Sequence, residues 1–293
     1  MSPQAETRAE RDLVSLPAVL VEGVVRRALV EDLGQAGDVT TRAVVLPAAE
    51  CRAAIVARHE GVLAGAQATT LAFTLVDAGL TVRFEVYDGS AVAQGNVVAV
   101  VGGSTRSILT AERTALNFLC HLSGIATATN RLVQAVQGTN AKICCTRKTT
   151  PGLRVLEKYA VRAGGGVNHR LGLDGAILIK DNHIAVAGGV ARALESAQES
   201  AGPLTPIEIE VDTLEQLDEA VEGGASVILL DNMPPSVLLK AVEKVDGRVR
   251  LEASGNVTSN TVREIAETGV DYISSGWITH SAPILDFGLD FSG

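Results

Sequence analysis

The sequence predicts an α/β protein with an N-terminal α+β sandwich-like domain followed by an open (β/α) barrel. Two observations predict the barrel. From residue 141 onward, short apolar segments alternate with helical ones, which is typical of a parallel sheet with right-handed crossovers. A polar or charged residue follows almost every apolar segment, and barrel enzymes carry their functional groups at the carboxyl ends of strands. An open doubly wound sheet is the alternative.

The amino-acid composition excludes some classes of protein, in particular those that bind nucleic acids. The chain has 293 residues, of which 46% are hydrophobic and 20% charged, so it can build a large core. Its formal net charge is -9, whereas proteins that bind nucleic acid through phosphates are usually basic. Aromatic residues make up only 3%, which argues against stacking platforms for single strands. We therefore expect no nucleic-acid partner.

The N-terminal stretch MSPQAETRAERD is polar, and no run of about 18 apolar residues occurs, so we expect a cytoplasmic protein without a membrane partner. The four cysteines show no CxxC spacing. We interpret them as small buried hydrophobic residues rather than as metal ligands.

The first hundred residues read as a mixed α+β module. Residues 13–33 have helical periodicity, with Ser15 as a candidate cap and Pro17 in the first turn. Residues 37–41 read as a turn into an extended segment. Turn residues bound the three expected strands, and a helix lies between the first two. These strands are residues 51–58, 82–87 and 97–101, and the helix is residues 66–78.

A long helix is predicted over residues 107–136, with a possible interruption at Ser123-Gly124. It carries the charged pair Glu112 and Arg113. From the residues alone, this pair reads as an ordinary surface ion pair of little energetic value.

The alternating part contains six expected strands and the helices between them. The strands are residues 141–145, 176–179, 207–211, 227–230, 249–252 and 272–274, and the helices are residues 153–163, 184–198, 213–222, 235–245 and 258–267. Six units in so short a stretch favour a small barrel, complete or not.

The stretch from Cys144 to His183 concentrates cations in an acidic protein. They are Arg147, Lys148, Arg154, Lys158, Arg162, His169, Arg170 and Lys180. An anionic ligand with several carboxylates or phosphates explains such a cluster. A solvated basic surface is the alternative.

The residues at the strand ends fall into three kinds. Cations follow the first two strands, carboxylates close the middle ones, and small residues follow the last two. The groups are Thr146, Arg147, Lys148, Lys180 and Asp181, then Glu210, Asp212, Asp231 and Asn232, then Ser254, Gly255, Asn256, Ser274, Ser275 and Gly276. The carboxylates suit Mg²⁺ or ribose hydroxyls, and SGN before a helix from residue 258 suits a phosphate. Ordinary turns are the alternative for SGN and SSG.

Other motifs are absent from the sequence. It has no GxxxxGK[ST], and AGGGVNHR does not follow a strand as a dinucleotide fingerprint does. No HExxH or Cys-His cluster suggests zinc.

The chain resembles the bacterial quinolinate phosphoribosyltransferase family over nearly its whole length, and seven segments carry the resemblance. They are EDLGQAGDVTT, TAERTALNFLCHLSGIAT, TRKTTPGLRVLEKYAVRAGGGVNHR, ILIKDNH, IEIEVDTLEQ, ILLDNM and LEASGNV. The resemblance implies that quinolinate and 5-phosphoribosyl-1-pyrophosphate give nicotinate mononucleotide, pyrophosphate and CO₂ with Mg²⁺, in NAD synthesis. It also implies a head-to-tail homodimer, an N-terminal domain over residues 1–116 with the tail 280–293 packed back on it, and a barrel over residues 117–279.

The resemblance assigns roles to individual positions. Quinolinate would be bound by Thr146, Arg147, Lys148, His169, Arg170 and Lys180, with Arg113 supplied by the partner subunit. Ribose and Mg²⁺ would be held by Glu210 and Asp231, which with Lys148 form the expected catalytic set. Phosphate would be bound by Ser254, Gly255, Asn256, Ser274, Ser275 and Gly276. The roles of Asp181, Asn182 and His183 stay open.

Three rivals remain at this point. One is a paralogue associated with molybdenum transport, and another is an aldolase that forms a Schiff base on Lys180. The third is an anion-binding protein without catalysis. The intact set of cations, carboxylates and small-residue loops favours the phosphoribosyl transfer.

Overall fold

The computed structural model describes residues 13–291, and this part of the chain divides into two compact units. One unit takes the residues up to Asn130, the segment Thr150–Gly165 and the residues from Ser281 on. The other takes Arg131–Thr149 and Gly166–His280. The domain boundaries expected from the sequence, after residues 116 and 279, stay a prediction.

The first unit is built on a four-stranded antiparallel sheet in the order β12-β1-β5-β3. The C-terminal tail supplies its edge strand, since Ala57 pairs with Phe287 and Ala53 with Phe291. Two hydrogen bonds from Arg58 to the Asp290 carboxylate hold this edge. The strands are β1 (Glu50–Ala57), β3 (Thr81–Phe84), β5 (Val97–Ser104) and β12 (Phe287–Phe291), and a separate short pair is β2 (Gly61–Val62) with β4 (Ala91–Val92).

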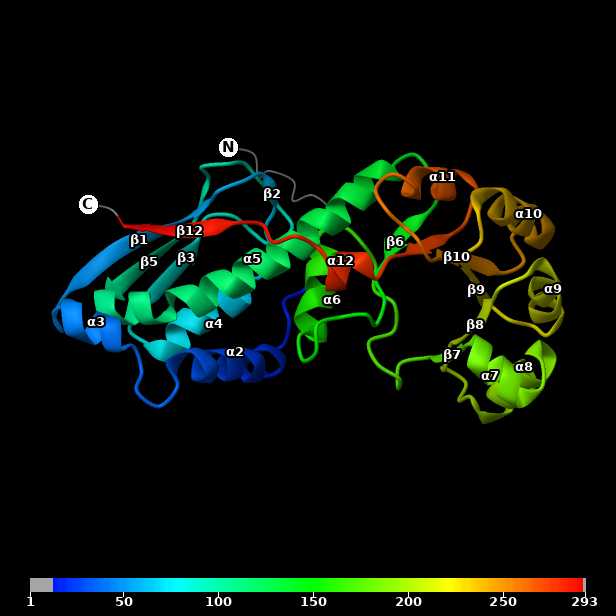
Figure 1. The fold of residues 1–293 in the computed structure, drawn as a ribbon, viewed down its shortest axis with the longest axis horizontal. Coiled ribbons are helices and arrows are strands. Elements are labelled where there is room, and N and C mark those ends of the chain that lie inside the picture. The colour runs from blue at the N-terminus through cyan, green and yellow to red at the C-terminus, as the bar shows by residue number, and fades with distance from the viewer. Residues whose placement is uncertain (1–12, 292–293) are drawn as a thin grey trace, which may run out of the picture. The chain divides into compact units, whose positions relative to one another are not determined.

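Helices cover this sheet, and Figure 1 shows α2, α4 and α5 on one side of it. The helices of this unit are α2 (Ala18–Leu33), α3 (Val39–Val44), α4 (Ala66–Val76), α5 (Thr105–Ala135) and α6 (Arg154–Ala163). The expected cap of α2 at Ser15 is wrong, because the helix begins after Pro17 without a side-chain cap. The extended segment expected at residues 37–41 is also wrong. Asp38 accepts a hydrogen bond from the Thr41 N–H at 2.8 Å and starts α3 instead.

Helix α5 runs without the expected interruption at Ser123-Gly124. Ser123 Oγ accepts a hydrogen bond from the Ala64 N–H at 2.9 Å, so this serine fastens the helix to the loop after β2. A Cβ on Gly124 would lie 2.3 Å from the Pro283 carbonyl oxygen. The small residues therefore allow close approach of the chain rather than a break.

The second unit is a six-stranded parallel sheet in the order β6-β11-β10-β9-β8-β7. Strands β7 to β11 lie in chain order, whereas a doubly wound sheet reverses its order at a switch point. The open (β/α) barrel is thus confirmed and the doubly wound alternative is wrong. The strands are β6 (Lys142–Cys144), β7 (Ile177–Ile179), β8 (Ile207–Val211), β9 (Val227–Asp231), β10 (Arg250–Ser254) and β11 (Tyr272–Ser274).

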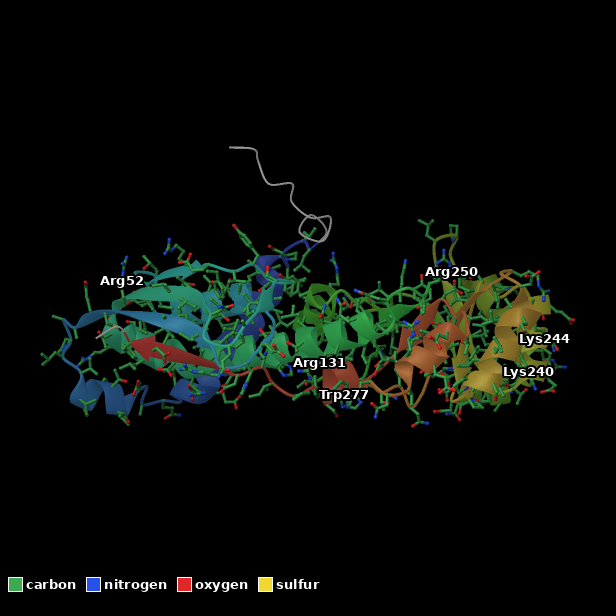
Figure 2. All side chains as sticks on the ribbon, turned by 90° about the horizontal axis from the view of Figure 1, so that it is seen from above. Arg52, Arg131, Lys240, Lys244, Arg250 and Trp277 are labelled. Atoms are coloured by element: carbon green, nitrogen blue, oxygen red, sulfur yellow. The ribbon has the colours of Figure 1, made fainter. Side chains whose placement is uncertain are left out.

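Helices follow the strands and lie on the outer side of the sheet (Figure 1). They are α7 (Asp181–Ala187), α8 (Val190–Ser200), α9 (Leu214–Glu222), α10 (Pro235–Val245), α11 (Val262–Glu267) and α12 (Trp277–His280). On α10, Leu238, Ala241 and Val245 are buried, while Lys240 and Lys244 face solvent (Figure 2). Between residues 13 and 291, no helix is both long and apolar enough to span a membrane.

Candidate active site

A cavity of about 630 Å³ opens at the carboxyl ends of the second unit's strands. It collects most of the residues that the sequence predicted, and they come from all six strands. Its lining comprises Thr146, Arg147, Lys148, His169, Arg170, Leu178, Lys180, Glu210, Leu229, Asp231, Asn232, Glu252, Ser254, Gly255, Asn256 and Ser274. Asp212, which also follows a strand, is exposed outside this lining.

Arg147, Lys148, Arg170 and Lys180 form the cationic wall of this cavity. Arg170 is positioned by a segment that is not a strand. Val167 forms a parallel bridge beside β6, with its N–H on the Ile143 oxygen at 2.8 Å and its oxygen on the Cys145 N–H at 3.2 Å. This bridge brings Arg170 to the cavity, where its Nη1 donates to the Ala176 oxygen at 2.8 Å. Burial, together with the nearby charge of Arg147, lowers the pKa of Arg170. Two guanidinium groups held close together indicate a site for an anion.

Lys180 follows β7 and reaches across to the next strand. Its Nζ lies 2.5 Å from Glu210 Oε2, and the Glu210 side chain is largely buried. The Lys180 N–H donates to His183 Nδ1 at 2.9 Å, so His183 fixes the turn into α7. The cavity therefore presents an ion pair between its cationic and carboxylate sides.

Asp231 closes β9 beside a strained residue. Asn232 has a φ of 53° and donates from Nδ2 to Asp231 Oδ2 at 2.7 Å, and its N–H donates to the Ser254 oxygen at 2.8 Å. Glu210 and Asp231 both line the cavity with carboxylate oxygens, the ligands that Mg²⁺ prefers. The two residues therefore have the chemistry to hold this ion.

A second cavity of about 470 Å³ adjoins the first, and both are lined by Thr146, Lys148, Ser254, Gly255, Asn256 and Ser274. Small and hydroxyl residues dominate its lining, together with the chain's single tryptophan, Trp277 on α12 (Figure 2). The lining comprises Thr146, Lys148, Ser254 to Ser259, Ser274 to Trp277 and His280. All the small strand-end residues predicted for phosphate binding lie here.

Two glycines in this cavity are required by close contacts. Gly255 has a φ of +95°, and a Cβ on it would lie 2.0 Å from Asn232 Oδ1. A Cβ on Gly276 would lie 2.9 Å from Lys148 Cδ. Thr279 Oγ1 donates to the Lys148 oxygen at 2.8 Å. Gly276 and Thr279 therefore fix Lys148, which lines both cavities, and Gly255 allows the close approach of Asn232.

The helix expected from residue 258 is wrong in its start, because α11 begins at Val262. Ser254, Gly255 and Asn256 thus form a loop rather than a helix N-terminus. Thr261 explains why the helix starts later than expected. Its Oγ1 accepts a hydrogen bond from the Thr258 N–H at 3.0 Å and holds the intervening residues in a turn. By contrast, Ser274 to Gly276 lead directly into α12.

Sequence reasoning missed two buried carboxylates, Glu208 on β8 and Glu252 on β10. His169 Nε2 lies 2.8 Å from Glu208 Oε2 and 3.9 Å from Glu252 Oε2. Each lies two residues before an expected site residue, Glu210 or Ser254, and residues two apart in a strand share a face. A charge inside an otherwise apolar strand was the available signal.

The side chains of His169, Glu208 and Glu252 have nitrogen and oxygen atoms that could bind a metal ion, and these atoms lie within 4.8 Å of one another. Their hydrogen bonds argue against a metal ion. The Arg170 N–H donates to His169 Nδ1 at 2.9 Å, so the ring proton resides on Nε2, where it faces Glu208. If His169 bound a metal ion through Nε2, its ring proton would move to Nδ1 and would point at the N–H of Arg170. A hydrogen-bonded network therefore fits His169, Glu208 and Glu252 better than a metal site does.

Arg113 lies elsewhere, exposed on α5 of the first unit. Its neighbour Glu112 is half-buried, and burial raises the pKa of that carboxyl against the opposing effect of Arg113. The cysteine interpretation holds in part, because Cys120, Cys144 and Cys145 are buried and Cys51 is half-buried.

Comparison with known proteins connects these features to one family. Residues 125–290 match the model of the quinolinate phosphoribosyl transferase C-terminal domain, and residues 38–123 match that of the N-terminal domain. A nicotinate-nucleotide pyrophosphorylase [carboxylating] from Mycobacterium leprae is 48% identical, over 91% of this chain and 95% of the relative. A probable enzyme of the same name from Bacillus subtilis is 44% identical, over 89% of each chain.

Solved structures agree with these sequence relatives. The structure of NadC from Streptococcus pyogenes superposes with a TM-score of 0.91 at 41% identity, over 96% of this chain and all of the other. The nicotinate-nucleotide pyrophosphorylase from Francisella tularensis has a TM-score of 0.91 at 38% identity, over 96% and 99% of the two chains. The resemblance drawn from the seven motifs is thereby confirmed, and this chain belongs to the quinolinate phosphoribosyltransferase family.

Proposed function

We propose that this chain joins quinolinate to 5-phosphoribosyl-1-pyrophosphate and releases pyrophosphate and CO₂, giving nicotinate mononucleotide for NAD synthesis. One observation carries the proposal: a cavity lined by cations adjoins a cavity lined by small polar residues, and Lys148 lines both. The first suits a planar dicarboxylate and the second suits a phosphate. The names of the relatives and the matching family models support the same reaction.

The residues of the cationic wall bind quinolinate. Arg147, Lys148, Arg170 and Lys180, with Thr146 and His169, surround a space of suitable chemistry. Guanidinium groups bind carboxylates through two parallel hydrogen bonds, which fix the plane of the ring as well as its charge. Both carboxylates of quinolinate are then held, and its ring nitrogen faces the second substrate.

The sugar phosphate binds beside it. Hydroxyls and peptide N–H groups of Ser254, Gly255, Asn256 and Ser274 to Gly276 surround the phosphates, as in other barrels that bind phosphate through their last two loops. Glu210 and Asp231 face the ribose. As the bond from the anomeric carbon to pyrophosphate breaks, positive charge develops on the ribose, and carboxylates nearby stabilise it.

Glu210 and Asp231 are also the residues that would hold Mg²⁺, partly through substrate or water. When bound, the ion neutralises charge on the departing pyrophosphate. Binding of Mn²⁺ as a paramagnetic substitute, read from solvent-proton relaxation, tests this assignment without turnover. Asp231→Asn should weaken Mn²⁺ binding in the presence of the sugar phosphate, while the exposed Asp246→Asn leaves it unchanged. Equal binding by both variants would reject Asp231 as a ligand.

Decarboxylation follows from the first step. Once the ring nitrogen carries the ribosyl group, the ring is a pyridinium that accepts the electron pair left when the adjacent carboxylate departs as CO₂. That carbon then takes a proton. The protein's part is to align the substrates and exclude water, so we expect no single general base to carry the rate. A residue whose substitution abolishes chemistry while both substrates still bind would contradict this expectation.

The direct test measures nicotinate mononucleotide and ¹⁴CO₂ together from carboxyl-labelled quinolinate, with the sugar phosphate and Mg²⁺ each omitted in turn. The proposal expects one CO₂ per mononucleotide and no product when any component is left out. Lys148→Ala supplies the inactive comparison, and Lys240→Ala on the outer face of α10 supplies the active control. No product from the folded wild-type protein would reject the proposed function.

A homodimer that shares Arg113 is part of the proposal, and its support is the family resemblance. Mixing Arg113→Ala subunits with Lys148→Ala subunits tests it, because one site in each heterodimer would combine the two intact residues. About a quarter of wild-type activity should return if subunits mix at random. Failure of the mixed subunits to regain activity, with heterodimers shown by mass spectrometry, would exclude a shared site.

The three alternative functions, a Schiff-base aldolase, a paralogue linked to molybdenum transport and a non-catalytic anion-binding protein, are less well supported. A Schiff-base lysine needs a neutral amine, commonly in an apolar pocket, whereas Lys180 is ion-paired with Glu210. Borohydride trapping with a carbonyl substrate tests that rival directly. A paralogue linked to molybdenum transport predicts turnover with another pyridine carboxylate or none, and an anion-binding protein predicts quinolinate binding without product. The expected cytoplasmic location stays a prediction that cell fractionation can test.

A further inference from the structure

The proposed reaction assigns no role to Glu208 and Glu252, yet both are buried within the strands behind the cationic wall. Their exposed fractions are 8% and 4%, and Glu252 lines the larger cavity. Burying two carboxylates so close together is unfavourable unless hydrogen bonds or protonation compensate. The side chain between them is His169, which makes its protonation state decisive.

The contacts of His169 define its tautomer. Its Nδ1 accepts the peptide N–H of Arg170 at 2.9 Å, so Nδ1 carries no proton. Its Nε2 then carries the ring proton and donates it to Glu208 Oε2 at 2.8 Å. The imidazole is therefore neutral, and its Nε2 proton is directed to a buried carboxylate.

The second carboxyl group, Glu252, has a different environment. Burial, reinforced by the negative charge of Glu208, raises the pKa of Glu252 to about 7, whereas a hydrogen bond with Ser274, and a positive charge on His169 if the ring were protonated, would oppose the shift. Cys145 at the end of β6 acts weakly in the same direction as Glu208. Near neutral pH, a large fraction of Glu252 is thus an uncharged acid.

We propose that Glu252 is a positioning residue that keeps His169 neutral and thereby holds Arg170 in place for the carboxylates of the substrate. The inference rests on the proposed function, because it takes quinolinate as the ligand. Ionised Glu252 would place two negative charges beside the imidazole and favour its protonation at Nδ1. That new N–H would oppose the N–H of Arg170, and the peptide that carries the guanidinium would turn away.

The test compares wild type with Glu252→Gln, which is uncharged at every pH, and with the matched control Glu195→Gln on the exposed face of α8. Calorimetry measures the dissociation constant of quinolinate from pH 6 to pH 8.5. If only the protonated state binds well, wild type and the control should weaken about tenfold between pH 6 and pH 8. Glu252→Gln should bind within about threefold of wild type at pH 6 and stay nearly constant with pH.

A second readout is made on the wild-type protein, and a variant is needed only to assign one resonance. Nitrogen NMR of the histidine side chains at pH 6.5 should show His169 protonated on Nε2 and unprotonated on Nδ1, with the resonance assigned by its loss in His169→Gln. A doubly protonated His169 at pH 6.5 would overturn the proposal. A loss of about tenfold or more in quinolinate affinity in Glu252→Gln at pH 6 would also overturn it, because the carboxylate itself would then be required.

The two proposals fail in different ways. If wild type binds the sugar phosphate, seen as a change in Trp277 fluorescence, but binds no quinolinate at any pH, the proposed function fails. If wild type binds quinolinate but its pH dependence persists in Glu252→Gln, the role of Glu252 fails while the function stands.

Discussion

The two cavities of the second unit recognise anions by different means. Arg147, Arg170 and Lys180 line only the larger, whereas hydroxyl residues and glycines dominate the smaller, and Ser254 to Asn256 with Ser274 line both. A guanidinium matches the fixed geometry of a carboxylate, while peptide N–H groups at close range suit a phosphate. The difference indicates that side-chain charge orients the reacting ring and that backbone geometry anchors the sugar. Substitutions in the two cavities should therefore affect different kinetic parameters.

Lys148 should give the largest effect because it lines both cavities. Lys148→Ala removes a charge between the two substrates, and we expect kcat/KM to fall about 10²- to 10³-fold for both. Steady-state kinetics with each substrate varied in turn measures this effect. A loss confined to one substrate's KM would show that the cavities act separately at this residue.

Arg170 tests the larger cavity alone. Arg170→Lys keeps the charge but removes the planar pair of donors, so the KM for quinolinate should rise about 10- to 100-fold. Binding of 5-phosphoribosyl-1-pyrophosphate, followed by Trp277 fluorescence, should stay as in wild type. Equal weakening of both substrates would contradict the division between the cavities.

Gly276 tests the smaller cavity. An added methyl group would press on Lys148 Cδ, 2.9 Å away, and on His280 Cδ2, 3.2 Å away. Gly276→Ala should displace the lysine and lower kcat about tenfold with little loss of folding stability. Thermal unfolding supplies the stability control. Unchanged kcat would mean that the lysine side chain relaxes at no cost to catalysis.

Besides its effect on the pH dependence of quinolinate binding, Glu252 should give a small effect on stability. Its pKa is about 7 in the folded chain against 4.5 for an ordinary glutamate, so the folded state keeps a proton that the unfolded chain releases. This stabilisation is complete below pH 4.5 and is lost as the pH rises through 7. Between pH 5 and pH 8, the melting temperature of wild type should fall a few degrees more than that of Glu252→Gln. Parallel curves for the two proteins would argue against an elevated pKa.

The arrangement of the strands was predictable from sequence because it follows from simple rules. Short apolar segments separated by helices require a parallel sheet, and the carboxyl ends of its strands meet at one edge. That reasoning alone brought Lys180, Glu210 and Asp231 together, and they do line one cavity. The resemblance added the roles of these residues.

The errors of the sequence-based prediction came from local hydrogen bonds in two cases and from contacts between distant segments in the others. Asp38 caps a helix where an extended segment was expected, and Thr261 delays the start of α11. Gly124 allows close approach to the Pro283 carbonyl group, a contact far along the chain that no local pattern reveals. Glu208 and Glu252 were missed because the partner of both carboxylates, His169, lies on a distant segment of the chain that only the fold brings close.

The bridge between Val167 and β6 has a consequence for how this fold tolerates change. In a closed barrel, a strand would complete the ladder beside β6; here the segment that carries His169 and Arg170 occupies that edge. Loops are usually where homologous chains gain and lose residues most freely. An insertion after Val167 would both uncover the sheet edge and shift the guanidinium of Arg170. We therefore expect the length of this loop to vary less among functional relatives than that of the loops on the opposite face of the sheet.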